Sequence, residues 1–213
     1  MISRWLPLLT SIAVSGLGLM STGCHDFAVL IANMQGGDTI EAEFKLDKGP
    51  LLIFIDDRRG LITEPRAMRE LHDTIADNFI RYDVNNRVIP FRELQRLQQS
   101  EPKFDKLSIR EIGERLGADQ VLYLGVEKFT LYSEPGAPLF KGLFAVRVKV
   151  LTTERKTETR VWPREKIGKL VQSETRPTPT EGDKAPSDIA TELGVKLAQR
   201  VAGLFYKHKE FAD

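Results

Sequence analysis

The fold is decided by a short apolar run that ends in charged residues: Leu51-Leu52-Ile53-Phe54-Ile55-Asp56-Asp57-Arg58-Arg59-Gly60. A strand with one wet face alternates apolar and polar residues, whereas an unbroken apolar run is typical of a strand that is covered on both faces. We therefore expect a central strand over Leu51–Ile55, followed at its carboxyl end by a charged loop.

Strand and helix signals flank this run. Upstream, Glu41–Leu46 alternates apolar and charged residues, which predicts a strand with one wet face. Downstream, Thr63 can cap a helix that has Pro65 in its first turn. An apolar stripe at spacings of three and four marks this helix: Met68, Leu71, Ile75, Phe79 and Tyr82. A short strand at 87–89 and a short helix from Phe91 follow.

The second half of the chain carries further regular elements. The capping box Ser108-Ile109-Arg110-Glu111 begins a helix that ends at Gly117. Strands are predicted at 120–132, 143–151 and 160–163, with an edge strand at 169–174. Ser187 begins a last helix, in which a column of small residues would allow close packing on a sheet: Ala190, Gly194, Ala198 and Ala202.

Together these elements predict a single α/β domain over residues 41–207, with a mixed sheet covered by helices. Within it, 175–186 holds three prolines and no large apolar residue, so we expect an exposed loop there. Residues 208–213 are predicted to form a tail.

The first 23 residues have the pattern of a cleaved signal peptide. Arg4 is followed by an uncharged segment, Trp5–Met20, and by small residues before the only cysteine, Cys24. The motif Ser21-Thr22-Gly23-Cys24 resembles the lipobox of bacterial lipoproteins, although Ser21 stands where Leu is usual. This resemblance implies that Cys24 carries fatty acyl chains such as palmitate and that 24–40 is a lipid-anchored segment. The alternatives are an ordinary signal peptide with a chance cysteine, or a cytosolic protein with a buried first helix.

The composition argues against several classes of protein. Lys+Arg is 31 and Asp+Glu is 30, which is too balanced for a nucleic-acid binder. One cysteine cannot form an internal disulfide framework, and the three histidines are scattered. The chain contains no phosphate-binding loop, zinc-protease or serine-hydrolase motif, so we expect no catalytic residue, cofactor or metal.

The best candidate site is the loop Asp56-Asp57-Arg58-Arg59, because ligands of α/β sheets bind beyond the carboxyl ends of strands. The two aspartates and two arginines could hold a cation or a phosphate; the alternative is a solvated loop that neutralises itself.

Four other side chains are weaker candidates. Trp162 could contact a partner protein or could be a core or sheet-edge aromatic. Arg147 and Lys149 could meet anionic lipid or peptidoglycan, or simply form a solvated face. His72 is expected to be a partly exposed helix histidine.

One longer stretch resembles a known superfamily. Residues 109–126 read as a helix, Leu-Gly-Ala-Asp and a strand with a glycine, Ile109-Arg110-Glu111-Ile112-Gly113-Glu114-Arg115-Leu116-Gly117-Ala118-Asp119-Gln120-Val121-Leu122-Tyr123-Leu124-Gly125-Val126. This order is similar to the CsgG, LpoB and TolB N-terminal domains, and the similarity extends roughly over Leu51–Trp162 and the last helix. It implies a lipoprotein accessory or assembly factor of the cell envelope. A secretion pore is excluded, because the segments 133–141 and 152–159 are too short or too charged for membrane hairpins.

The sequence thus predicts a lipid-anchored envelope protein that acts by protein–protein interaction, without catalysis. His25 after Cys24 resembles the enterobacterial signal for the outer membrane, so we expect its periplasmic face. The runner-up is an envelope enzyme that binds or hydrolyses a small ligand with Asp56 and Asp57. The partner is not named by the sequence, and a homo-oligomer is left open.

The anchor can be tested directly. Cys24→Ala removes the thiol that would receive the lipid, so fatty-acid labelling should disappear and uncleaved precursor or a soluble form should accumulate. Metabolic labelling with radioactive palmitate measures this. A wild-type protein that incorporates no label would contradict the lipoprotein interpretation.

Overall fold

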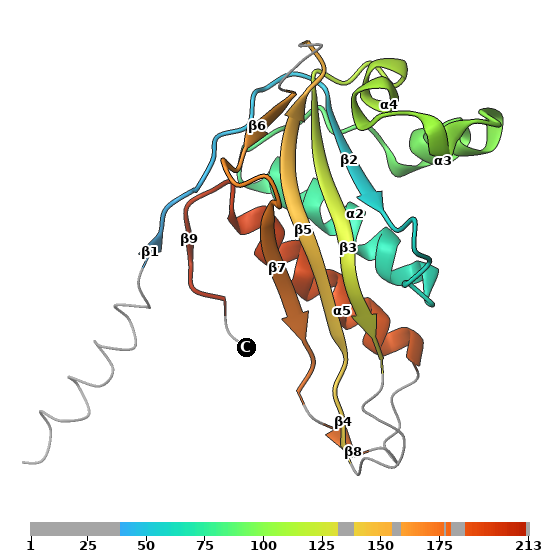
Figure 1. The fold of residues 1–213 in the computed structure, drawn as a ribbon. Coiled ribbons are helices and arrows are strands. Elements are labelled where there is room, and N and C mark those ends of the chain that lie inside the picture. The colour runs from blue at the N-terminus through green and yellow to red at the C-terminus, as the bar shows by residue number, and fades with distance from the viewer. Residues whose placement is uncertain (1–38, 132–138, 155–158, 177, 180–185, 212–213) are drawn as a thin grey trace, which may run out of the picture. The chain divides into compact units, whose positions relative to one another are not determined.

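A five-stranded mixed sheet lies at the centre of the domain, as the computed structural model shows (Figure 1). The structure describes residues 39–131, 139–154, 159–176, 178–179 and 186–211. They belong to one compact unit, which starts at Thr39. The prediction of a single α/β domain with a mixed sheet covered by helices is confirmed.

The elements follow one another in this order: β1 (Thr39–Ile40), β2 (Leu51–Asp56), α2 (Pro65–Arg81), α3 (Phe91–Ser100), the 3₁₀ helix η1 (Phe104–Lys106), α4 (Ile109–Arg115), β3 (Gln120–Thr130), β4 (Leu139–Phe140), β5 (Leu143–Thr152), β6 (Arg160–Trp162), β7 (Lys169–Glu174), β8 (Thr178–Pro179), α5 (Pro186–Gly203) and β9 (His208–Lys209). Two further two-stranded pairs, β1–β9 and β4–β8, accompany the main sheet.

Strand β2 lies at an edge of the main sheet, so the prediction of a central strand was wrong. The strands run in the order β2-β3-β5-β6, and β7 also pairs with β5. β2 is parallel to β3, and the other pairs are antiparallel. All six β2 residues are nevertheless buried. An unbroken apolar run indicates that both faces of a strand are covered. It does not indicate how many other strands pair with that strand.

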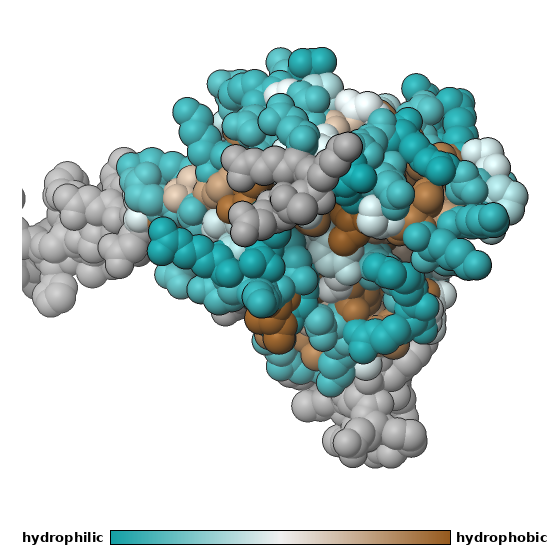
Figure 2. All heavy atoms as spheres, turned by 45° about the horizontal axis from the view of Figure 1, so that its top comes forward, coloured by the Kyte–Doolittle hydropathy of each residue, from teal (hydrophilic) through white to brown (hydrophobic). Residues whose placement is uncertain are grey.

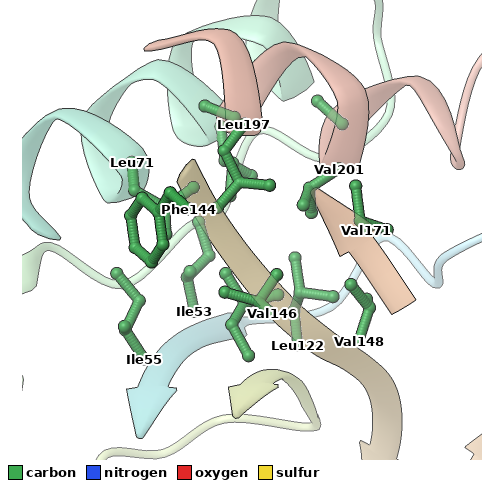
Figure 3. Packing of buried hydrophobic residues seen from close by; sticks show 14 of the residues in the cluster. Ile53, Ile55, Leu71, Leu122, Phe144, Val146, Val148, Val171, Leu197 and Val201 are labelled. Atoms are coloured by element: carbon green, nitrogen blue, oxygen red, sulfur yellow. The ribbon is translucent and has the colours of Figure 1, made fainter. Parts of the chain in front are cut away.

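The first face of the sheet packs against α2 and α5 and forms the main core. Ile53 and Ile55 of β2 point into it together with Leu122 of β3 and Val146 of β5 (Figure 3). The apolar stripe predicted for α2 is buried at Leu71, Ile75 and Phe79 and exposed at its end, Tyr82.

Gly194, in the column of small residues on α5, packs against α2, whereas the prediction placed this column on the sheet. A Cβ on Gly194 would lie 2.7 Å from the carbonyl oxygen of Ala67 in α2, so only glycine allows this approach of the two helices. Sequence spacing identifies a close-packing surface, but it does not say which element occupies it.

The second face is covered only in part. Helices α3 and α4 pack on Leu52 and Phe54 of β2 and on Val121 of β3. The predicted capping box is present, since Ser108 Oγ accepts a hydrogen bond from the Glu111 amide and the Glu111 carboxylate accepts one from the Ser108 amide. The rest of this face, which carries Tyr123, Arg147, Lys149 and Leu170, is called the open face below; in Figure 1 it is turned to the viewer, with α2 and α5 behind it.

Three further predictions were wrong in detail. Residues 41–46 form no strand; Phe44 and Leu46 still point inward, and the amides of Glu43 and Phe44 donate to the carbonyl of Leu204. Glu64, and not Thr63, precedes the first residue of α2, and it makes no side-chain cap. Helix α5 begins at Pro186, so Ser187 lies inside its first turn.

The segments predicted to be irregular are partly ordered. His208 and Lys209 of the predicted tail pair with β1. In the predicted exposed loop, β8 pairs with β4, and Thr175 is buried with its Oγ1 accepting a hydrogen bond from Gly142. The signal peptide and Cys24 lie outside the described residues.

The core of the sheet gives a stability prediction. Leu124 is 0% exposed, so Leu124→Ala should lower the free energy of unfolding by about 2–5 kcal/mol, as truncation of core leucines does. Leu170→Ala is the matched control, since this side chain is 45% exposed and should cost less than about 0.5 kcal/mol. Urea denaturation of the two variants measures the difference; equal losses would contradict the assignment of the open face.

Candidate functional site

The predicted site loop begins at Asp56, the last residue of β2. Two neighbouring side chains donate hydrogen bonds to the carboxylate of Asp56. Arg58 Nε donates to both carboxylate oxygens at 3.0 Å, and Arg58 Nη2 donates to Oδ2 at 2.7 Å. The hydroxyl of Tyr123, on the neighbouring strand β3, donates to Oδ2 at 2.8 Å. Asp56 is 8% exposed and Arg58 covers it from the solvent side.

These contacts change the acidity of the three groups. Burial opposes the ionisation of Asp56, but the hydrogen bonds from Arg58 and Tyr123 and the charge of Arg58 outweigh it, so the pKa of Asp56 falls below its ordinary 3.8. The pKa of Arg58 is raised by its hydrogen bond to Asp56. Burial and the hydrogen bond to Asp56 raise the pKa of Tyr123 to about 12, so this phenol stays protonated and keeps donating.

Asp57 and Arg59 shape the loop. Asp57 Oδ1 and Oδ2 accept hydrogen bonds from the amides of Leu61 and Ile62, each at 2.8 Å. Arg59 Nη2 donates to the carbonyls of Val126 at 2.6 Å and Glu127 at 3.0 Å, which ties the loop to β3. The loop therefore neutralises itself through Asp56 and Arg58, as one of the two sequence interpretations has it, but Asp56 is buried and not solvated.

Two hollows meet at the Asp56–Arg58 ion pair. The acidic hollow, about 500 Å³, lies between the end of β2, η1 and the start of α4, and the acids that line it are Asp56, Asp57, Glu101 and Asp105. The basic hollow, about 330 Å³, lies on the open face, and the bases that line it are Arg58, Arg59, Arg147 and Lys149.

The basic hollow joins two candidates that are far apart in the sequence. Strand register places Asp56, Gly125, Arg147 and Leu170 side by side across β2, β3, β5 and β7. The loop arginines and the basic face of β5 therefore line one hollow. This proximity follows from the pairing of three strands, which residue spacing alone does not predict.

Gly125 is one of the site residues that sequence reasoning missed, together with Tyr123 and Ile167. A Cβ on Gly125 would lie 3.0 Å from both Cε1 and the hydroxyl oxygen of Tyr123, so a side chain here would displace the phenol that bonds Asp56. It would also occupy the space between Asp56 and Arg147. The available signal was a glycine inside a strong strand pattern, which often marks a close approach of another group.

Trp162 and His72 do not belong to this site. Trp162 lies on β6, at the other edge of the sheet, where its half-buried ring packs against Phe44 and Phe205 at centroid distances of 6.0 and 5.8 Å. His72 is buried, and not partly exposed as predicted; its Nδ1 lies 2.9 Å from Asp73 Oδ1, and its ring packs on Phe91.

Two searches over the described ranges bear on the kind of site. Within them, no group of three or more His, Cys, Asp and Glu side chains is arranged to hold a metal ion. No helix of the same residues is both long and apolar enough to cross a membrane.

Comparison with known proteins gives distant structural matches. No protein family and no curated protein matches the chain. The PelC dodecamer from Paraburkholderia phytofirmans is 14% identical, with a TM-score of 0.37 over 78% of this chain and 97% of that one. The hypothetical protein CT253 from Chlamydia trachomatis is 12% identical, with a TM-score of 0.41 over 74% and 98%. Lipoprotein GNA1162 from Neisseria meningitidis is 12% identical, with a TM-score of 0.40 over 73% and 99%. These scores lie below 0.5, so the resemblance to the CsgG, LpoB and TolB domains stays a prediction.

The hydrogen bonds of Asp56 with Arg58 and Tyr123 predict a pH dependence of stability. Because the pKa of Asp56 is lower in the folded protein than in the unfolded chain, its charge stabilises the fold above the unfolded pKa. This contribution is lost as the pH falls through the folded pKa. Asp56→Asn should therefore lower stability at neutral pH by about 1–2 kcal/mol, a figure kept small because Arg58 is solvent exposed.

The measurement is the free energy of unfolding against pH. From about pH 5 to about pH 2 the wild-type curve should fall more steeply than that of Asp56→Asn. Asp77→Asn, an exposed change on α2, is the control and should run parallel to the wild type. Parallel curves for all three proteins would refute a stabilising role for the Asp56 charge.

Proposed function

We propose that this protein is a lipid-anchored component of the bacterial cell envelope that acts by binding another protein, without catalysis. The observation that carries the proposal is the open face of the sheet, where charged side chains surround exposed apolar ones. Ile167 is 62% exposed and Leu170 is 45% exposed, and both lie at or beside the basic hollow. Figure 2 shows exposed hydrophobic areas, in brown, among hydrophilic side chains, in teal. Protein-binding surfaces combine such apolar anchors with a polar rim.

The anchor is supported by the sequence. The segment 1–23 and Cys24 have the order of a lipoprotein signal, and the acyl chains of a modified Cys24 would hold the domain at a bilayer. We place the protein on the periplasmic face of the outer membrane on the basis of His25.

The carboxylates of the runner-up enzyme already have structural partners. Both carboxylate oxygens of Asp57 accept hydrogen bonds from backbone amides. Both carboxylate oxygens of Asp56 accept hydrogen bonds from Arg58 or Tyr123. A general base must be free to accept a proton from its substrate, and a carboxylate whose pKa is lowered is a poorer base. These contacts support a structural role for the pair.

The variant Asp57→Asn separates binding from catalysis. An amide has one acceptor oxygen where the carboxylate has two, so one of the two loop amides loses its partner, which should lower stability by about 1–2 kcal/mol. Acid–base chemistry by the Asp56–Asp57 pair would be abolished. We expect this variant, expressed as the full-length lipoprotein, to complement a deletion strain and to capture the same crosslinked protein as the wild type.

The control for this experiment is Asp77→Asn, which changes the same functional group on an exposed helix face. Crosslinking in membranes followed by denaturing purification measures capture, and a second copy of the chain counts as a captured protein. Loss of complementation by Asp57→Asn, at a temperature where the variant is still folded and with unchanged capture, would favour the enzyme. Absence of any captured protein for the wild type would refute the proposal itself.

A further inference from the structure

We infer that the basic hollow on the open face is a docking site for an acidic segment of a partner protein, one that carries apolar side chains between its acids. This inference rests on the proposed function, since it names the surface and the chemistry through which the protein would bind its partner.

The first argument is local charge. The hollow is lined by the cations of Arg58, Arg59, Arg147 and Lys149 and by two acids, Asp56 and Glu127. Asp56 is bound to Arg58, and Glu127 Oε1 lies 3.5 Å from Arg147 Nε. This pairing leaves the charges of Arg59 and Lys149 without a carboxylate at ion-pair distance among the described residues. A chain with almost equal numbers of acids and bases therefore has a local positive excess at this position.

Two of the bases of the hollow, Arg59 and Lys149, are held in place by neutral groups. Arg59 donates to two backbone carbonyls of β3, and Lys149 Nζ lies 5.8 Å from the centre of the Tyr123 ring. Arg147 differs from these two, because its Nε is buried and lies 3.5 Å from Glu127 Oε1. Arg59 and Lys149 therefore keep their charge available to an incoming carboxylate at a small cost in side-chain entropy.

The second argument is the apolar surface beside these charges. Ile167 lines the hollow, and Leu170 is the cross-strand neighbour of Arg147 in the register of β5 and β7. A free inorganic anion would use only the cations. A peptide with alternating acidic and apolar side chains would use the cations and would also bury the two exposed aliphatic side chains.

The third argument separates a peptide from an anionic membrane surface. The acidic hollow shares Asp56 and Arg58 with the basic one and adds Asp57, Glu101 and Asp105. Because the two hollows share residues, a broad layer of lipid phosphates over the basic hollow would come close to the acids of the other one, which would repel it. A single chain segment is narrow enough to contact the basic hollow alone, so the charge pattern favours a peptide.

The test uses the detergent-solubilised full-length protein and three fluorescein-labelled peptides: three repeats of Glu-Glu-Leu, of Glu-Glu-Gly and of Lys-Lys-Leu. Fluorescence anisotropy at low and high salt measures binding. We expect the Glu-Glu-Leu peptide to bind most tightly, the Glu-Glu-Gly peptide more weakly, and the Lys-Lys-Leu peptide not at all. Added salt should weaken the binding of both acidic peptides, because screening acts on the charge contacts.

Two double variants test the charged and the apolar side chains of the surface separately. Arg147→Gln with Lys149→Gln should weaken Glu-Glu-Leu binding about tenfold, since Lys149 no longer pairs with the peptide and the loss of Arg147 leaves the charge of Glu127 uncompensated beside the peptide. Ile167→Ser with Leu170→Ser should remove the preference for Glu-Glu-Leu over Glu-Glu-Gly. The matched control is Arg69→Gln with Arg92→Gln, two bases that line a separate hollow of about 470 Å³ beside Asp73, and it should change binding less than about twofold.

Several outcomes would overturn the inference. The control variant could weaken binding as much as the Arg147 and Lys149 variant, which would indicate general charge attraction. Vesicles of phosphatidylglycerol could bind in place of the peptides, with vesicles of phosphatidylcholine as the comparison, which would assign the hollow to a membrane surface. If the Arg147 and Lys149 variant does not fold by circular dichroism, the peptide preference and the Ile167 and Leu170 variant still decide the question.

The failure of this inference is distinguishable from the failure of the proposed function. If crosslinking in membranes captures a protein equally from the wild type and from both surface variants, the protein binds a partner through another surface. If the wild type captures no protein, the proposed function itself has failed.

Discussion

Both faces of β2 must be removed from water, and the rest of the structure depends on this constraint. Its six residues are all buried, although the strand lies at the edge of the sheet. Two helical layers are needed to cover it: α2 and α5 pack over Ile53 and Ile55, and α3 and α4 pack over Leu52 and Phe54. The parallel pairing with β3 then determines where the strand ends and which side chain lies beside its last residue.

The helices on the second face are short, and this has a consequence for the site. They cover β2 and the beginning of β3, but they leave the middle of β3, β5 and β7 open. Across that boundary the strand register aligns Asp56, Gly125 and Arg147, so a buried carboxylate with an exposed arginine partner borders an exposed sheet surface. Gly125 favours this arrangement, because a Cβ there would lie 3.0 Å from the ring and hydroxyl of Tyr123 and would press the phenol away from its present position.

The charges around this boundary form one acidic and one basic region, although the chain has almost equal numbers of acids and bases. The Asp56–Arg58 pair is satisfied within itself and lies between an acidic and a basic hollow. Its carboxylate, with a lowered pKa and donors on both oxygens, is suited to stabilising the loop. The surface beside it, with bases held by carbonyls and an aromatic ring, is suited to recognition. In the function that we propose, the partner binds the open face, whereas the loop contributes stability.

Local patterns in the sequence determined the helices, most of the strands and the capping box of α4, because periodicity and capping act within a few residues. They also determined that Asp56–Arg59 follows a buried strand. Only the tertiary structure decided that β2 is an edge strand, that Gly194 of α5 meets α2, and that Arg147 and Lys149 share a hollow with Arg58. Each of these depends on which elements become neighbours across long stretches of chain, and burial patterns record that a residue is covered without recording what covers it.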